Sequence, residues 1–337
     1  MSHKFNLILF FFFLSITSIQ AKIEGVIEKI PLLTNPNLPK IAPVTKENEI
    51  IISREEYVLS YNKEKRIPNW VSWTLNKEDL GDAERSSSFS RDFDLEKYFK
   101  EKRLPNKAVT STEYAKSCFD RGHQVPSGDR TKNYVNNKST FYMSNMAPQT
   151  PYLNRYLWKN LEVYTRNYIL TKNKKAYVIA GPILDQELGY LGPKKDILIP
   201  SKFFKIIFFI DEKEKFESIS DKTEYIAVIM PNILNNGTIP NEDFIHSCQS
   251  FALNDVEIEG ETIALESSSN HSNVSTSISI SLQIEAEQKK EEWTLIDESR
   301  DEARQAPQRG KILQYNNWQD FKTNLNEIEK VSGLKLI

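Results

Sequence analysis

Five short runs of β-branched and aromatic residues occur along the chain, each bounded by polar or turn-forming residues. Runs of this length and composition are typical of β-strands. The predicted strands are residues 56–61, 70–75, 176–180, 197–210 and 225–230. In the fourth, nearly every residue from 203 to 210 is apolar. We therefore expect that strand to be covered on both faces of its sheet.

A helical pattern lies between the second and third predicted strands, at residues 151–168. Four apolar side chains recur there at helical spacing and would pack on the sheet. They are Leu153, Leu157, Leu161 and Tyr164. Strands and helices together predict an α+β fold with a central mixed, mainly antiparallel β-sheet and packed helices.

A second helix is predicted near the end of the chain, at residues 318–336. Phe321, Leu325 and Ile328 fall on one face of such a helix. Gly333 stands where a helix C-cap is expected.

The composition divides the chain into a main domain and three accessory segments. We predict the main domain at residues 49–253, completed by a closing segment at residues 312–337, with an extended arm before it at residues 22–48. Residues 254–311 form an acidic, serine-rich insertion. Such a tract cannot bury enough apolar surface to offset its ordering entropy, so disorder or loose helix is expected. A peripheral strand at residues 274–280 is the alternative.

Charge is distributed unevenly between these segments. The whole chain has a formal net charge of −2, but residues 254–302 carry about 13 acidic and 3 basic residues. The remainder of the protein is therefore basic by about 8 charges, which would attract a polyanion.

The first 21 residues have the pattern of a secretory signal peptide. A short basic start precedes an apolar run at residues 7–16 and a polar end at Ala21. That run is too short to span a bilayer comfortably. We expect cleavage after Ala21, a secreted or periplasmic protein, and no stable membrane association thereafter. An uncleaved membrane anchor is the alternative.

The chain contains two cysteines, Cys118 and Cys248. In an oxidising compartment they could close a loop of about 130 residues as one disulfide. Two buried free thiols are the alternative.

Among four histidines, only His123 has polar neighbours suited to catalysis. The run Asp120-Arg121-Gly122-His123 sets a cation and a flexible glycine beside the imidazole, and glycine lets the backbone approach a substrate closely. His3 belongs to the signal peptide, His271 lies in the serine-rich tract, and His246 follows apolar residues. We predict that His123 is a general base. A structural histidine is the alternative.

The predicted helix at residues 151–168 carries a second, polar face. Asn154 and Glu162 lie eight residues apart on it, a rise of ~12 Å at ~1.5 Å per residue. Both side chains can hardly ligate one ion, so we predict Asn154 as the metal ligand and Glu162 at the metal-bound waters. That division suits Mg²⁺, with Mn²⁺ as a substitute. A merely solvated helix face is the alternative.

Arginines near these residues are candidates for phosphate contact, because a guanidinium group can bind two phosphate oxygens. They are Arg121, Arg85, Arg91, Arg155 and Arg166. Asn145 ends a β-like run at residues 139–144 and would orient a water or the histidine, or cap a turn. A base, an oxygen-rich metal site and arginines indicate phosphodiester chemistry.

The order and spacing of these residues resemble the DNA/RNA non-specific endonuclease family. The resemblance rests on Asp120-Arg121-Gly122-His123, on Thr140 to Asn145, on Pro148-Gln149, and on Asn154, Trp158 and Leu161-Glu162. It implies a ββα-metal motif, with His123 at the end of one strand. A second strand would run through residues 141–145, and the helix of Asn154 would cross both.

The resemblance also implies roles for individual side chains. The histidine would be the general base, the asparagine would hold Mg²⁺, and the glutamate would orient metal-bound waters. Arg85 best matches the upstream catalytic arginine of the family, with Arg91 as the alternative. The main domain would then be a secreted, Mg²⁺-dependent endonuclease acting on DNA and RNA. A catalytically silent nucleic-acid-binding protein, a hydrolase of another phosphodiester, and a secreted structural or adhesion protein are the alternatives.

Overall fold

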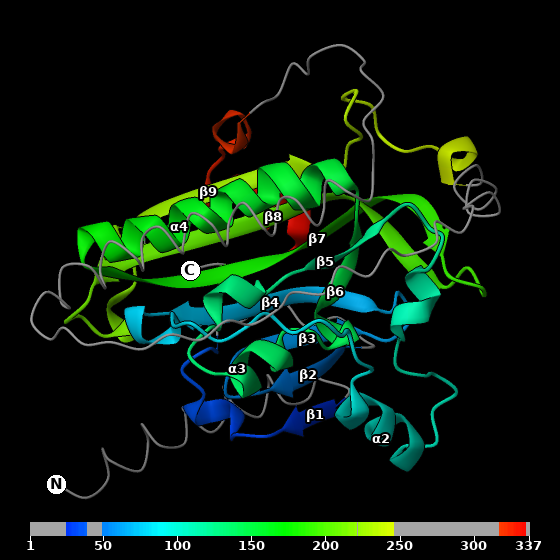
Figure 1. Ribbon diagram of the computed structural model, residues 1–337, viewed down its shortest axis with the longest axis horizontal. Coiled ribbons are helices and arrows are strands. Elements are labelled where there is room, and N and C mark those ends of the chain that lie inside the picture. The colour runs from blue at the N-terminus through cyan, green and yellow to red at the C-terminus, as the bar shows by residue number, and fades with distance from the viewer. Residues whose placement is uncertain (1–24, 39–48, 221, 246–316, 335–337) are drawn as a thin grey trace, which may run out of the picture. The chain divides into compact units, whose positions relative to one another are not determined.

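A seven-stranded sheet in the order β1-β2-β3-β4-β7-β8-β9 carries the other elements of the protein (Figure 1). The computed structural model describes residues 25–38, 49–220, 222–245 and 317–334. The strands of the sheet are β1 (Gly25–Glu28), β2 (Glu49–Ser53), β3 (Val58–Asn62), β4 (Ile67–Leu75), β7 (Lys174–Leu191), β8 (Ile197–Asp211) and β9 (Glu224–Pro231). The signal peptide, the acidic insertion and Cys248 lie outside the described residues, and Cys118 is disulfide-bonded.

Strand pairing confirms the predicted fold class. β1 pairs with β2 in parallel, and every other neighbouring pair of the large sheet is antiparallel. A separate two-stranded sheet is formed by β5 (Asp120–His123) and β6 (Met146–Gln149). The described part of the chain is thus α+β with a mixed, mainly antiparallel sheet.

Helices and short helical turns connect and cover these strands. The α-helices with bounds inside the described residues are α2 (Phe93–Glu101), α3 (Tyr134–Ser139), α4 (Lys159–Lys172) and α7 (Leu325–Ser332), and residues 242–245 are also helical. The 3₁₀ turns are η1 (Leu32–Thr34), η2 (Lys77–Asp79), η3 (Ser111–Tyr114), η4 (Ser127–Asp129), η5 (Met143–Asn145), η7 (Phe216–Ser218) and η8 (Trp318–Phe321), and η6 (Leu153–Trp158) is a π-helix. Among the described residues, no helix has the length and apolar character needed to cross a membrane.

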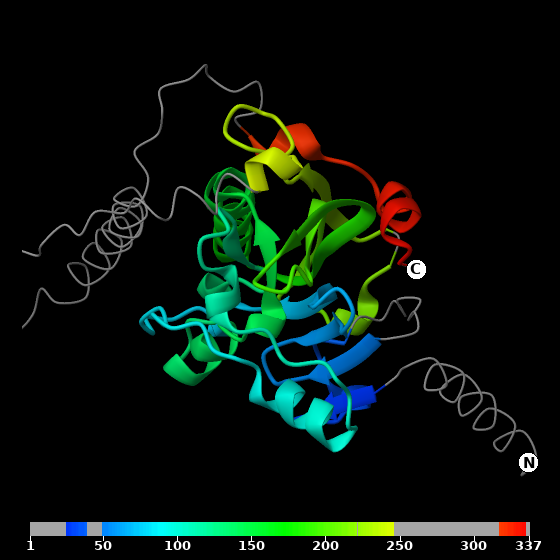
Figure 2. The ribbon, with the colours of Figure 1, turned by 90° about the vertical axis from the view of Figure 1, so that its right-hand side faces the viewer.

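Both faces of the large sheet are buried, because alternate residues of its strands enter two different apolar clusters. In β8, Phe203 joins the cluster beneath α4, whereas Phe204 joins the cluster that contains Ile328 of α7. Figure 2, turned by a quarter circle from Figure 1, shows α4 and α7 on different sides of these strands. The prediction that β8 is covered on both faces is confirmed.

Regular structure departs from the sequence prediction at both ends of the described chain. It begins at β1, within the predicted arm and ahead of residue 49, and β1 adds a parallel strand to the sheet edge. The closing segment is not one helix, since η8 and α7 are separated by an extended Lys322. Gly333 adopts a φ of +72° directly after α7, so its predicted C-cap role is confirmed.

Candidate active site

The two-stranded sheet β5–β6 positions the histidine. His123 ends β5 and pairs with Met146, and Asp120 pairs with Gln149 at the other end. The second strand therefore lies at β6, and the prediction that it runs through residues 141–145 is wrong. Residues 134–139 form α3 and residues 143–145 a 3₁₀ turn, so the β-like run expected at residues 139–144 is absent from this described segment.

The side chain of Asn145 explains why this segment turns. It is fully buried, and its amide nitrogen donates to the carbonyl oxygens of Val125 and Thr140 at 3.0 and 2.9 Å. Its amide oxygen accepts from the backbone N–H of Val125 at 3.0 Å. These bonds use its donors and its acceptor on the backbone, which favours the turn-holding alternative over contact with a reacting group.

Gly122 makes room for a neighbouring side chain. A Cβ atom at Gly122 would lie 2.2 Å from Oε1 of Gln149, far closer than atoms can approach. Glycine is therefore needed here by Gln149. Close approach of a substrate to the backbone, the reason anticipated from the sequence, is not what the contacts indicate.

The imidazole of His123 is enclosed by aromatic rings. Its centroid lies 5.5 Å from that of Phe89 and 4.7 Å from that of Phe141, and the side chain is nearly buried. Burial, and then the positive charge of Arg85, hold the pKa of His123 well below its ordinary value. Among the described residues, its Nε2 atom has no hydrogen-bond partner. A neutral imidazole ring is suited to accept a proton.

Of the two candidate upstream arginines, only Arg85 lies beside the histidine. Its guanidinium is 5.0 Å from the centroid of the Phe141 ring and donates to the Ser127 hydroxyl. Arg91 instead lies 3.8 Å from Glu96, and its side chain is 43% exposed. Geometry thus favours Arg85.

Arg121 approaches the same aromatic wall from β5. Its guanidinium lies 5.2 Å from the ring centroid of Phe89, and its Nε and Nη2 atoms donate to the carbonyl oxygen of Ser111 at 3.2 and 2.7 Å. Phe89 therefore contacts both Arg121 and His123.

The orientation of Asn154 is set by Asp120. The amide nitrogen of Asn154 donates to Asp120 at 2.8 Å, which leaves its amide oxygen as the group available to a cation. Arg155 donates to the same carboxylate through Nε and Nη2, each at 2.8 Å. Arg155, predicted to contact phosphate, is therefore engaged in a bidentate ion pair.

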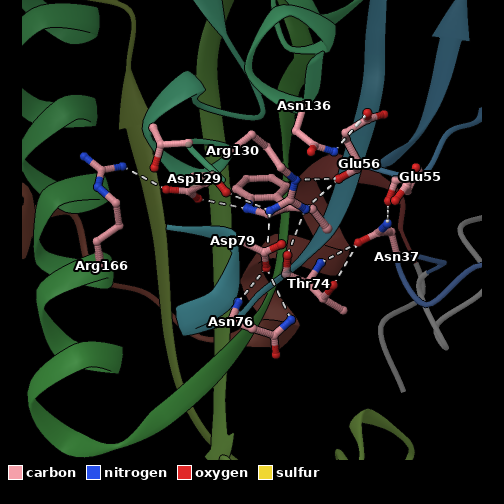
Figure 3. Close-up of polar contacts among 12 residues, drawn as sticks. Asn37, Glu55, Glu56, Thr74, Asn76, Asp79, Asp129, Arg130, Asn136 and Arg166 are labelled. Carbon is pink, nitrogen blue, oxygen red and sulfur yellow. Dashed lines mark hydrogen bonds and ion pairs between the residues drawn. The ribbon is translucent and has the colours of Figure 1, made fainter. Parts of the chain in front are cut away.

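Arg166, on α4, is also ion-paired with a carboxylate, as Arg155 is. It donates to Asp129 at 2.8 Å, and Trp73 donates to the other oxygen of that carboxylate at 2.9 Å. Figure 3 shows Arg166 pointing at Asp129, with Arg130 on the far side bound to the carbonyl oxygen of Thr74 at 2.9 Å. Arg166 thus anchors α4 to a buried polar network.

Glu162 has a partner that the sequence did not predict. Nζ of Lys205, on β8, donates to Oε1 of Glu162 at 3.2 Å. Lys205 is buried and Glu162 is mostly buried, and this removal from water raises the pKa of Glu162 and lowers that of Lys205. The only indication in the sequence is one cation within the apolar run from Phe203 to Ile210.

The helix that carries Asn154 and Glu162 contains a π-helical segment near its start. Residues Leu153–Trp158 have π-helical backbone and continue directly into α4. The buried Leu153, Leu157 and Leu161 confirm the predicted apolar stripe. A π-turn contains more residues than an α-turn, so it rotates Asn154 relative to Glu162, and such turns are frequent at functional sites.

The donor set around Asn154 fits a cation that keeps most of its water. Among the described residues, no three or more His, Cys, Asp and Glu side chains come together as a metal site. Asn154 instead presents one neutral oxygen, oriented by Asp120. A hard cation that needs few protein ligands, such as Mg²⁺, suits this arrangement.

Comparisons with known proteins agree on one enzyme class. A family model described as DNA/RNA non-specific endonuclease matches residues 34–263. The chain is 39% identical to a nuclease of Nostoc sp. (strain PCC 7120) over 206 residues, covering 60% of this chain and 69% of that protein. It is 32% identical to the mitochondrial endonuclease G of Bos taurus over 209 residues, covering 59% of this chain and 64% of that protein.

A solved structure is also similar to the chain. It is the EndoG/EndoGI complex, with a TM-score of 0.45, 28% identity, and coverage of 59% of this chain and 83% of that chain.

Proposed function

The chain belongs to the DNA/RNA non-specific endonuclease family, and from that premise we propose that it hydrolyses DNA and RNA with His123 as general base and Mg²⁺ held by Asn154. The observation that carries this proposal is the state of His123. Its ring is buried and neutral, and its Nε2 atom has no partner among the described residues. A base must be unprotonated at working pH, and this environment favours that form.

In the proposed reaction, the imidazole of His123 takes a proton from a water molecule. The water oxygen attacks phosphorus as the bond to the 3′-oxygen breaks, and that oxygen then takes a proton from solvent. Arg85 lies close enough to His123 to disfavour its protonation, and it supplies positive charge next to the phosphate. Arg121, which contacts the Phe89 ring, supplies a second positive charge.

Asn154 would hold the cation through its amide oxygen, with Asp120 fixing the orientation of the amide. When bound, Mg²⁺ supplies charge that offsets the negative charge developing on the phosphate and the leaving oxygen. Mn²⁺ is expected to substitute. We assign Glu162 to orienting the waters around the cation. This agrees with its place in α4, whereas Asn154 lies in the preceding π-helix η6.

Arg155 and Arg166 act, in this proposal, mainly through the carboxylates that they bind. Arg155 holds the Asp120 carboxylate in place beside Asn154, and Arg166 holds Asp129 in place beneath α4. Direct phosphate contact would be left to Arg85 and Arg121. Contacts limited to phosphate and sugar carry no sequence information, so little sequence preference is expected.

Export is a separate proposal that rests on the first 21 residues alone. Their basic, apolar and polar zones support a cleavable signal peptide and a secreted or periplasmic enzyme. Mass spectrometry of the protein recovered outside the cytoplasm should give Lys22 as its first residue. An intact Met1 on the exported protein would contradict cleavage.

The function is tested by incubating purified protein with supercoiled plasmid and with single-stranded RNA. Both should be degraded with Mg²⁺, cleavage should stop with EDTA, and excess Mg²⁺ or Mn²⁺ should restore it. A gel shift without cleavage would identify a silent nucleic-acid-binding protein. Cleavage that survives EDTA would contradict the metal assignment, and no effect on either polymer would contradict the activity.

A further inference from the structure

A buried lysine, Lys205, contacts Glu162 and Trp158 of the proposed site. Lys205, in the middle of β8, is 1% exposed. Lysine is almost never fully buried unless it is paired, because removing its charge from water is costly. Its same-face neighbours on the strand, Phe203 and Ile207, belong to the apolar core. An apolar side chain would suit packing at this position, so the ammonium group calls for a separate explanation.

The ammonium group of Lys205 contacts two parts of the site at once. Its Nζ atom donates to Oε1 of Glu162 at 3.2 Å and lies 4.0 Å from the ring centroid of Trp158. The indole N–H of Trp158 in turn donates to the carbonyl oxygen of His123 at 3.3 Å. One buried cation therefore contacts the carboxylate on α4 and the indole that binds the backbone of the histidine.

Three charged groups from three elements surround Glu162. Lys205 comes from β8, Arg166 from α4 itself, and Asp129 from η4. Burial raises the pKa of Glu162, while Lys205 and Arg166 oppose that rise and Asp129 adds to it. Of the two cations, Arg166 is ion-paired with Asp129 at 2.8 Å. Lys205 is thus the cation that Glu162 binds directly.

We propose that Lys205 is a positioning residue for phosphodiester cleavage, which fixes the direction of the Glu162 carboxylate while packing on Trp158. The inference rests on the proposed role of Glu162 at the waters around the cation. Lys205 itself touches neither substrate nor metal. Its effect should therefore appear in kcat and depend on the presence of Glu162.

The test is a double-mutant cycle with Lys205→Met and Glu162→Gln, assayed on a short duplex at saturating Mg²⁺. We expect Lys205→Met to lower kcat at least about tenfold and to change KM less than about threefold. In the Glu162→Gln background, Lys205→Met should change kcat less than about threefold. The acid limb of the kcat profile should move to higher pH in Lys205→Met, since Glu162 has then lost its bound cation.

A matched control lies on the same strand. Lys202 pairs with Asp185 at 2.7 Å near the surface, so Lys202→Met should keep kcat within about twofold of the parent. Thermal unfolding of all variants guards against loss of the fold. If Lys205→Met alone does not fold, the double variant lacks both buried charges and can still be compared with Glu162→Gln, which it should match.

The outcomes separate this inference from the proposed function. If Glu162→Gln lowers kcat and Lys205→Met does not, the positioning role of Lys205 is wrong and the function stands. An equal loss from Lys205→Met with or without Glu162 also overturns it, because the lysine then acts by another route. If Glu162→Gln cleaves like the parent, the role proposed for Glu162 fails, and the inference fails with it.

Discussion

The chemical state of His123 is decided by a small number of neighbours. Phe89 and Phe141 exclude water from its ring, and Arg85 adds a positive charge nearby. Together they disfavour the imidazolium form, so the ring remains a base below the pH at which an exposed histidine would be protonated. The same environment makes the stability of the folded protein sensitive to acid, because protonating this ring is costly in the folded state.

Replacing His123 should strongly lower activity and change how stability depends on pH. His123→Asn is expected to lower kcat by about a thousandfold, within the range for loss of a general base. Because its folded pKa lies below the unfolded value of about 6.5, the unfolded chain takes up the proton first, and stability is lost as pH falls through that range. The thermal midpoint of the parent should therefore fall more than that of the variant between pH 7.5 and 5. Equal falls would contradict the pKa assignment.

Arg85 and Arg91 offer a matched pair of substitutions. Arg85→Ala should lower kcat/KM by about 10- to 100-fold, because a charge-assisted contact to phosphate is removed beside His123. Arg91→Ala should remain within about twofold of the parent, since Arg91 faces Glu96. Steady-state cleavage of plasmid measures both. The reverse ranking would make Arg91 the functional arginine.

Sequence reasoning reached some residues of the site and not others. His123 was predicted from the polar residues next to it in the sequence. Asn154 was predicted from its place on the polar face of a helical pattern. Lys205 was not, because its role depends on β8 passing beneath α4, a contact across 43 residues of sequence. Nor could spacing reveal that Arg155 and Arg166 would be held by carboxylates from other segments.

At the scale of elements, the π-helix η6 controls the angle between Asn154 and the rest of the helix. Tyr156 lies within it and is 56% exposed. Removing one residue from a π-turn restores α-helical spacing and rotates everything before it by about 100° relative to α4. Asn154 would then lose its bond to Asp120.

Deletion of Tyr156 should therefore lower cleavage at least about a hundredfold without abolishing the fold. Tyr156→Ala, which keeps the residue count, should remain within about fivefold of the parent. Plasmid cleavage and circular dichroism measure the two properties. An active deletion variant would show that the π-turn does not position Asn154.

Helices and strands were predicted well where apolar periodicity is strong. They were predicted poorly where side-chain hydrogen bonds determine the backbone conformation. Five of the seven strands in the large sheet, β3, β4, β7, β8 and β9, were found from their β-branched runs, whereas β2 was not predicted. The position of β6 was missed because residues 139–144 alternate like a strand, yet Asn145 and the cap at Asn133 bond them into helical turns. Strand β1 was missed because it is four residues long and lies in a polar stretch.

At the scale of the whole molecule, strands from distant parts of the sequence meet at one site. β8 provides Lys205, β4 provides Trp73, and β5 provides His123. The acidic insertion apart, the chain is basic, which is favourable for a polyanionic substrate. Binding should therefore be dominated by phosphate charge.

Raising the salt concentration should weaken substrate binding to a similar extent for DNA and RNA. If two phosphates are neutralised, KM should rise about tenfold between 50 and 200 mM salt while kcat changes little. Arg85→Ala should reduce the slope of log KM against log salt by about 0.9. A KM insensitive to salt, or an unchanged slope in that variant, would argue against phosphate contacts by Arg85.

The two indoles beside Lys205 should make tryptophan fluorescence sensitive to changes at the site. Trp158 and Trp73 lie 4.0 and 5.9 Å from its Nζ atom by ring centroid, in a chain with five tryptophans. Tryptophan emission responds to a nearby charge, and here that charge is bonded to Glu162. Occupation of the site by a cation or an oligonucleotide should thus be visible in intrinsic fluorescence, without a label and before any bond is cut.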